Sequence, residues 1–334
     1  MAEPVRYERP SLGLVQKVRR SVGAFFTDGF FEGGSNLGKL LPISNPRYHD
    51  VEVETNLVYG DPSVAEHRLD VHRPKKHRGP LPTVLYLHGG GFRVLSKETH
   101  WLFALLFSRR GYLVLNIDYR LAPKHPYPAA IEDTCMAYCW AVKEAARLGG
   151  DPSRLIVAGE SAGANLATAL VLAATYKRPE PFARAVFDTG VVPAAALPAY
   201  GFLQISDPER YSRRYRLSGF TQDRLAEVAD AYLHGAQIDP DRGLDLADPL
   251  VAFERGEPPD RPLPPFCVHC GTRDILIDDS RRLEAALGKL GAKCETGWFD
   301  SEIHGFNAFV MRPNARRSWR ETFDFLDRHL PAKK

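Results

Sequence analysis

Short apolar runs and amphipathic stretches alternate along most of this chain. The apolar runs have the length of buried strands, and the stretches between them repeat apolar residues at helical spacing. We predict strands over residues 83–88, 112–118, 154–159, 183–190, 264–271 and 293–299, and helices over 128–150, 162–176, 279–291 and 314–330. Strands that alternate with helices over about 200 residues predict a mainly parallel sheet with helices on both faces.

Two further strands precede this alternation. Residues 51–60 and 65–74 alternate apolar and polar side chains, and a turn at Gly60–Asp61–Pro62 joins them. They are expected to form one edge of the sheet, which then has eight strands in an α/β fold.

Two segments do not follow the alternating pattern. One is residues 1–47, which include the aromatic stretch VGAFFTDGFF. The other is residues 193–243, which are rich in Pro, Tyr and Arg and include a predicted helix over 221–235. Elements outside a sheet core often cover functional surfaces. We expect an N-terminal and a second cap segment over the carboxyl edge of a sheet domain made of residues 48–192 and 244–334.

The charge balance narrows the classes of partner. The chain has 334 residues, with 44 Lys and Arg against 41 Asp and Glu, a formal charge of +3. A balance this mild does not favour a nucleic-acid partner. The N-terminus lacks the apolar core of a signal peptide, and no apolar run reaches the length of a transmembrane helix. A cytoplasmic protein without a transmembrane segment is expected.

The five cysteines are expected to be reduced, because an odd number without a leader suits a cytosolic protein. Cys267 and Cys270 form a CVHC motif inside a predicted strand, not at a helix N-terminus, and no second CxxC could complete a zinc site. Cys135 and Cys139 lie one helical turn apart. We expect these four to be core residues, and we expect neither a metal nor an organic cofactor.

The pentapeptide GESAG, Gly159 to Gly163, follows a predicted strand and precedes a predicted helix. In that context a G-x-S-x-G motif indicates a nucleophile elbow, whose sharp turn needs the two glycines. The N-terminus of the following helix offers unpaired N–H groups and a partial positive charge beside the serine. Ser161 is therefore the predicted nucleophile, although the pentapeptide alone would be modest evidence.

One histidine fits the base that such a serine needs. A serine hydroxyl is a weak nucleophile unless an imidazole accepts its proton. The chain order in sheets of this type is Ser, then Asp or Glu, then His, which leaves His304 and His329 after a strand-end acid. His329 ends the last predicted helix, where a positive charge suits the helix dipole. His304 lies in the loop SEIHGF and is the predicted base.

The acid that orients this base is expected at the end of a strand. Asp274 comes directly after the predicted strand 264–271 and is our choice, with Asp278 the weaker option. Asp278 and Asp279 are expected to cap the helix that follows.

Three consecutive glycines in HGGGF, His88 to Phe92, follow the first parallel strand. A turn there needs one glycine, and three indicate backbone N–H groups that must approach a ligand closely. An attacked carbonyl becomes an oxyanion that needs fixed donors. We predict these donors at Gly90, Gly91 and Ala162, and we expect His88 to hold the loop.

Taken together, these stretches resemble the hormone-sensitive-lipase-like family of α/β-hydrolases, the bacterial esterases with an HGGG motif. The matching stretches are HGGGF, DYRLAPKHPYPAAIEDT, GESAGANLA, GTRDILIDD and HGF, in the family's order over most of residues 80–330. The resemblance implies an α/β-hydrolase fold whose catalytic domain is residues 48–192 and 244–334. The family's site residues fall on the positions already chosen, namely Ser161, Asp274, His304, Gly90, Gly91 and Ala162.

Three positions depart from the family's pattern. Glu160 stands where the family often has Asp, Lys124 where it often has Glu, and Ala164 where it often has Gly. Glu160 keeps the negative charge, so we expect it to have little effect on the chemistry. Lys124 is expected on a surface loop.

The implied function is that of a serine carboxylesterase, which hydrolyses short- to medium-chain or aryl esters through an acyl-enzyme intermediate. An amide hydrolase or deacetylase, or a true lipase, would use the same triad. A ligand receptor on an inactive hydrolase scaffold is disfavoured, because His304 is present. Members of the family often pair through the last strands and helix, so a homodimer is one expected assembly.

Overall fold

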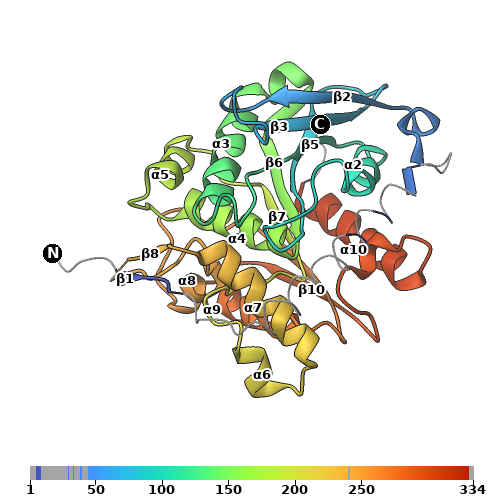
Figure 1. Cartoon of the computed structure of the whole chain (residues 1–334). Coiled ribbons are helices and arrows are strands. Elements are labelled where there is room, and N and C mark those ends of the chain that lie inside the picture. The colour runs from blue at the N-terminus through green and yellow to red at the C-terminus, as the bar shows by residue number, and fades with distance from the viewer. Residues whose placement is uncertain are drawn as a thin grey trace.

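A twisted sheet forms the centre of the computed structural model, which describes residues 5–8, 29, 33, 38–39, 44–239 and 241–330 (Figure 1). Within these residues the sheet has eight strands in the order β10-β9-β7-β6-β4-β5-β3-β2. They are β2 (Val51–Val58), β3 (Arg68–Pro74), β4 (Leu81–Leu87), β5 (Leu113–Ile117), β6 (Gly150–Glu160), β7 (Ala195–Ala199), β9 (Phe266–Gly271) and β10 (Cys294–Phe299). β3 pairs antiparallel with both β2 and β5 at one edge. The remaining neighbours, in the order β5-β4-β6-β7-β9-β10, pair parallel. The fold class predicted from the sequence is confirmed.

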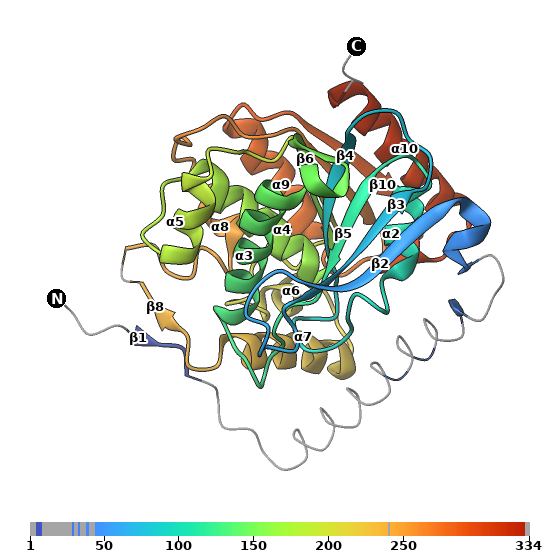
Figure 2. The same cartoon turned by 90° about the horizontal axis from the view of Figure 1, so that it is seen from above.

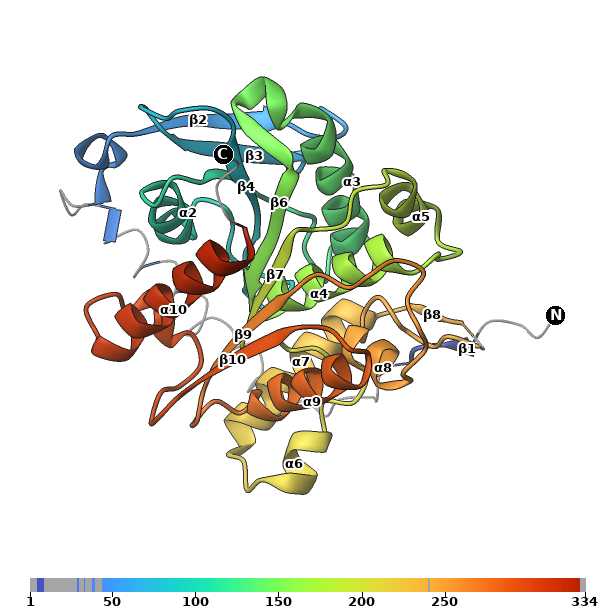
Figure 3. The same ribbon diagram turned by 180° about the vertical axis from the view of Figure 1, so that it is seen from behind.

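Helices cover both faces of this sheet (Figure 1). The helices α3 (Ala129–Glu144), α4 (Ala162–Thr175) and α5 (Pro181–Asp188) pack against one another on one face, and α2 (Trp101–Ser108) and α10 (Pro313–His329) cover the other. Figure 3 shows α8 (Pro249–Glu254) beside α9 (Ile277–Lys289), next to the β9–β10 edge. Every residue of α4 is buried, so this helix is covered on all sides, whereas α10 keeps a polar outer face.

One predicted strand is wrong. Residues 183–190 were expected in the sheet, but residues 181–188 form α5, in which Ala183 and Val186 share the buried face and Pro181 occupies the first turn. The strand that follows β6 in the chain is β7, whose sequence AALPA lacks the β-branched and aromatic residues that usually indicate a strand. β7 lies inside the range 193–243 assigned to the second cap segment, so the part of that range outside the sheet begins after Ala199.

The remainder of the second segment crosses the end of the sheet. It contains α6 (Arg210–Arg214), the predicted helix α7 (Gly219–Leu233) and the short strand β8 (Gln237–Ile238). Figure 2 shows α7 below the central helices and β8 beside β1 (Val5–Arg6), with which it pairs antiparallel. Apart from residues 5–8, 29, 33, 38–39 and 44–47, the predicted N-terminal cap segment lies outside the described residues.

No helix in the described part of the chain has the features of a membrane span, since none of these helices is both long enough and apolar enough to cross a bilayer.

Candidate active site

Ser161 occupies the turn between β6 and α4 in a strained backbone conformation, with φ +56° and ψ −116°. Non-glycine residues rarely adopt a positive φ, and such outliers concentrate at functional sites. The flanking glycines are required by close contacts. A Cβ on Gly159 would lie 2.5 Å from the carbonyl oxygen of Gly163, and a Cβ on Gly163 would lie 2.0 Å from that of Leu87. The turn is therefore the sharp elbow that the sequence predicts.

The structure brings the three predicted triad side chains into one hydrogen-bonded line. The Nε2 atom of His304 lies 2.9 Å from Ser161 Oγ, and its Nδ1 atom lies 2.8 Å from Asp274 Oδ2. Asp274 follows β9, is almost fully buried, and its other oxygen accepts the backbone N–H of Leu276 at 2.9 Å. Because Asp274 faces Nδ1, that nitrogen carries the proton and Nε2 is left to accept one from Ser161.

The surroundings of His304 act on its charge. Burial disfavours the imidazolium, but the carboxylates of Asp274 and, more weakly, Glu160 outweigh this effect, so the pKa of His304 is raised above its usual value. The site is thus arranged to favour a positive charge on the imidazole when it takes up a proton.

The glycine loop after β4 presents its backbone to the same place. Gly90 and Gly91 have positive φ angles of +109° and +59°, and a Cβ on Gly90 would lie 2.1 Å from the carbonyl oxygen of Val94. Within the described part of the chain, neither glycine N–H donates to a protein acceptor. Ala162 is the first residue of α4, where the helix leaves its N–H unpaired. These three amides remain available to a ligand.

Glu160 anchors the glycine loop to the elbow. Its carboxylate accepts the N–H of Gly89 at 2.5 Å, the hydroxyl of Tyr86 at 2.8 Å and the ring Nε2–H of His100 at 2.8 Å. This anchoring role was not predicted from the sequence. A carboxylate at the end of a central apolar strand is the one available signal, since a buried charge requires partners.

His88 lies at the base of the same loop. Its ring stacks on that of Tyr119 with centroids 4.2 Å apart, and the Tyr119 hydroxyl donates to the His88 carbonyl at 2.7 Å. Burial lowers the pKa of His88 to about 3, so the ring is neutral. These contacts fix the start of the loop.

The helix α7 packs directly on the glycine loop. A Cβ on Gly91 would meet Val228 at 2.7 Å, the rings of Phe92 and Tyr232 stack with centroids 3.8 Å apart, and an ion pair of 2.7 Å joins Arg93 to Glu227. The second cap segment therefore contacts the loop that supplies two of the predicted donors.

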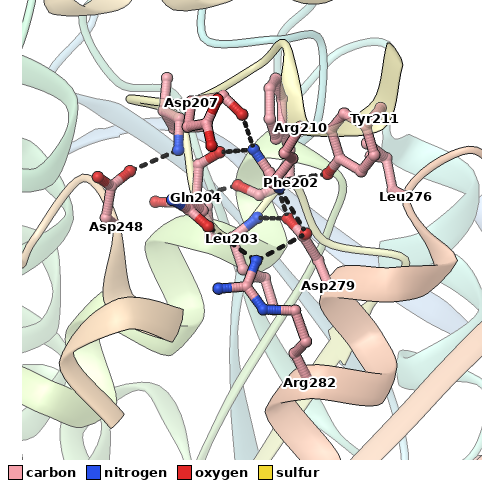
Figure 4. A network of polar contacts seen from close by, with 12 residues as sticks. Phe202, Leu203, Gln204, Asp207, Arg210, Tyr211, Asp248, Leu276, Asp279 and Arg282 are labelled. Atoms are coloured by element: carbon pink, nitrogen blue, oxygen red, sulfur yellow. Dashed lines mark hydrogen bonds and ion pairs between the residues drawn. The ribbon is translucent and has the colours of Figure 1, made fainter. Parts of the chain in front are cut away.

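The predicted capping role of Asp278 and Asp279 is wrong. Leu276 occupies the N-cap position of α9, and no side chain caps that end. Asp279 instead accepts the N–H of Leu203 at 2.9 Å and a two-pronged contact from Arg210, as Figure 4 shows. Asp278, the weaker candidate for the acid, pairs with Arg214 at 3.3 Å.

Arg210 is the centre of this polar cluster (Figure 4). Its guanidinium also donates to the carbonyl oxygens of Gln204 and Asp207, each at 2.6 Å. The cluster ties the segment after β7 to α9, the helix that begins just after Asp274.

The other predicted residues lie away from this line. His329 ends α10 and pairs with Glu295 at 2.9 Å, and Cys267 and Cys270 are buried free thiols in β9. Cys135 is also buried, whereas Cys139 is partly exposed, and Lys124 is exposed as expected.

Comparisons with known proteins agree with the fold. The profile of an α/β-hydrolase fold family matches residues 84–308. Carboxylesterase NlhH of Mycobacterium tuberculosis is 32% identical over 246 residues, which cover 72% of this chain and 71% of that protein. An acetyl-hydrolase of Streptomyces hygroscopicus is 32% identical over 259 residues, covering 76% of this chain and 77% of the relative.

Solved structures show the same similarity. A bacterial heroin esterase superposes with a TM-score of 0.71 at 26% identity, covering 85% of this chain and 86% of that one. An esterase of Pyrobaculum calidifontis has the same TM-score and identity and covers 94% of this chain and 97% of its own. The chain belongs to the α/β-hydrolase fold family.

Proposed function

We propose that this protein is a serine carboxylesterase in which Ser161 is the nucleophile, His304 the general base and acid, and Asp274 the residue that orients His304. The observation that carries the proposal is the line of two hydrogen bonds, 2.9 and 2.8 Å long, that joins the three side chains. The carboxylic ester hydrolase class expected from the sequence agrees with the names of the relatives.

In the first step His304 Nε2 takes the proton of Ser161 Oγ, and that oxygen attacks the ester carbonyl. The carbonyl π electrons move to its oxygen, which the N–H groups of Gly90, Gly91 and Ala162 then stabilise. His304, now protonated, is held by Asp274, which stays ionised. The raised pKa of His304 is consistent with this charge.

In the second half the tetrahedral intermediate collapses. His304 gives its proton to the departing alcohol oxygen, and the acyl group remains on Ser161. Water then repeats the sequence with His304 as base, the acid leaves, and the Ser161 hydroxyl is restored. The residues present account for each proton.

The names of the relatives support esters with short acyl chains. They include an acetyl-hydrolase, and a solved esterase structure with 26% identity and a TM-score of 0.67 was soaked with p-nitrophenyl butyrate. We therefore propose short- to medium-chain and aryl esters as substrates, with the segment after Ala199 covering them. The cytoplasmic location and the homodimer expected from the sequence remain predictions.

A panel of p-nitrophenyl esters from acetate to palmitate, with Ser161→Ala as control, tests this function. We expect kcat/KM to fall beyond medium chain lengths and Ser161→Ala to lower kcat by about 10⁴-fold or more. Near-wild-type ester hydrolysis by Ser161→Ala would remove the proposal. A rate that rises toward palmitate would favour the lipase alternative, and equal rates on a matched anilide would favour the amidase.

A further inference from the structure

Tyr200 follows β7 directly and lies beside the elbow in an unusual conformation. Its φ is +35°, and its side chain is only 1% exposed. Ser161 is another described non-glycine residue with a positive φ, and hydrogen bonds join its backbone to Ala199 and Phe202, which flank Tyr200 in the chain. Strained residues that persist at a site are held there by their surroundings, which directs attention to what Tyr200 contacts.

The side chain of Tyr200 makes two contacts with the loop of His304. Its ring packs against the imidazole of His304, with centroids 4.9 Å apart and planes at 71°. Its hydroxyl donates to Oδ1 of Asn307, which lies in the short helical turn after His304. The backbone carbonyl of Asn307 in turn accepts the indole N–H of Trp319 at 3.0 Å, so that turn is itself fixed.

The backbone around Tyr200 is bonded to the elbow and to β9. The Ser161 N–H donates to the backbone carbonyl of Ala199 at 3.0 Å, and the Phe202 N–H donates to the backbone carbonyl of Ser161 at 3.3 Å. The Tyr200 N–H donates to the carbonyl of His269 at 2.8 Å, in the strand that leads to Asp274. Tyr200 thus connects the strand of the acid to the loop of the base, and its neighbours Ala199 and Phe202 are bonded to the backbone of the nucleophile.

We propose that Tyr200 is a positioning residue that holds the imidazole plane of His304 in line with Ser161, its ring limiting rotation and its hydroxyl fixing the loop through Asn307. This inference rests on the proposed function of the triad. Tyr200 transfers no proton in the proposed reaction, because Ser161 and His304 account for every proton transfer and Asp274 orients His304. It acts by keeping Nε2 within reach of Oγ, where small misplacements are costly.

The decisive variant is Tyr200→Phe, which keeps the ring and removes only the hydroxyl. We expect kcat on p-nitrophenyl acetate to fall about 10-fold while KM changes little. A loosened His304 also loses part of the Asp274 interaction that raises its pKa, so the acid limb of the kcat/KM profile should move to lower pH. A structural role alone would not move that limb.

Tyr138→Phe is the matched control. Tyr138 in α3 is also fully buried, and its hydroxyl donates to the Val191 carbonyl at 2.9 Å. This variant should lose comparable thermal stability without a change in kcat or in the pH profile. An equal loss of kcat in both variants, or a Tyr200→Phe kcat within about twofold of wild type, would overturn the inference.

A double-mutant cycle isolates the tether. Asn307→Ala keeps the carbonyl that Trp319 uses, so it removes the acceptor of Tyr200 alone. If the pair acts as one unit, Tyr200→Phe with Asn307→Ala should lower kcat no further than either change. Fully additive losses would count against it. Failure of the proposed function would appear separately, as activity that survives in Ser161→Ala.

Discussion

Two buried carboxylates flank the triad, and they are held in different ways. Glu160, beside the nucleophile, accepts from a backbone amide, a tyrosine and a histidine, all from the region of the glycine loop. Asp279, just beyond the acid, is bound by the guanidinium of Arg210, which belongs to the second cap segment (Figure 4). Glu160 thus fixes the glycine loop beside Ser161, and Asp279 fixes the second cap segment that packs over this loop.

Because of this difference, we expect variants of Glu160 to lose catalytic rate and variants of Asp279 to lose stability. The Glu160 cluster sets where the amides of Gly90 and Gly91 lie, so its disturbance should appear mainly in the rate. The Asp279 cluster joins two parts of the fold through a buried ion pair, so its disturbance should appear mainly in stability. The amide variants of the two residues, Asp279→Asn and Glu160→Gln, are matched tests.

The largest expected effect is on the stability of Asp279→Asn. Removal of one charge from a buried pair leaves the other uncompensated, and we expect a loss of about 3–5 kcal/mol in the free energy of unfolding. Urea titration measures this loss. At a temperature where the variant is folded, its kcat should stay within a few fold of wild type. A large kcat loss with unchanged stability would erase the distinction between the clusters.

The next effect is on the rate of Glu160→Gln. A neutral amide cannot accept from all three donors, so the glycine loop should shift and kcat should fall about 10- to 100-fold. The negative charge of Glu160 also helps to raise the pKa of His304, so the acid limb of kcat/KM should move to lower pH. Stopped-flow rates across the pH range test both points. An unmoved limb would exclude the electrostatic part.

A smaller effect concerns acid stability. Burial, as the main cause, lowers the pKa of His72 and of His269 to about 4, while the unfolded value is about 6.5. The unfolded chain therefore binds protons first as the pH falls, and stability present above pH 6.5 is lost between about 6.5 and 4. At pH 5.5 we expect each histidine to have lowered the free energy of unfolding by about 1 kcal/mol relative to neutral pH.

His72→Leu tests this acid effect, because neither ring nitrogen of His72 has a hydrogen-bond partner among the described residues. The variant should unfold at a lower pH than wild type in circular dichroism titrations. An unchanged midpoint would show that other groups control acid unfolding.

The smallest expected effect is that of Val228→Ala. The shorter side chain leaves room beside Gly91 and loosens the contact between α7 and the glycine loop. We expect kcat/KM for p-nitrophenyl acetate to change by less than about threefold. A much larger loss would mean that α7 sets the loop geometry together with Glu160.

The sequence predicted most strands and helices, and it predicted that Ser161, Asp274 and His304 would meet, because motif context and chain order limit the choices. It failed at β7, whose alanines and proline carry little strand signal. It also failed at Asp279, since a capping pattern cannot reveal an arginine 69 residues earlier. The partners of Glu160 lie 60 to 74 residues upstream and were equally invisible.

The short antiparallel pair of β1 and β8 makes it possible to follow the movement of the second cap segment by fluorescence energy transfer. Val5 pairs with Ile238, so β1 is hydrogen-bonded to the second cap segment and not to the eight-stranded sheet. A fluorophore attached just ahead of Val5, paired with one on α10, would register any opening of that segment during turnover.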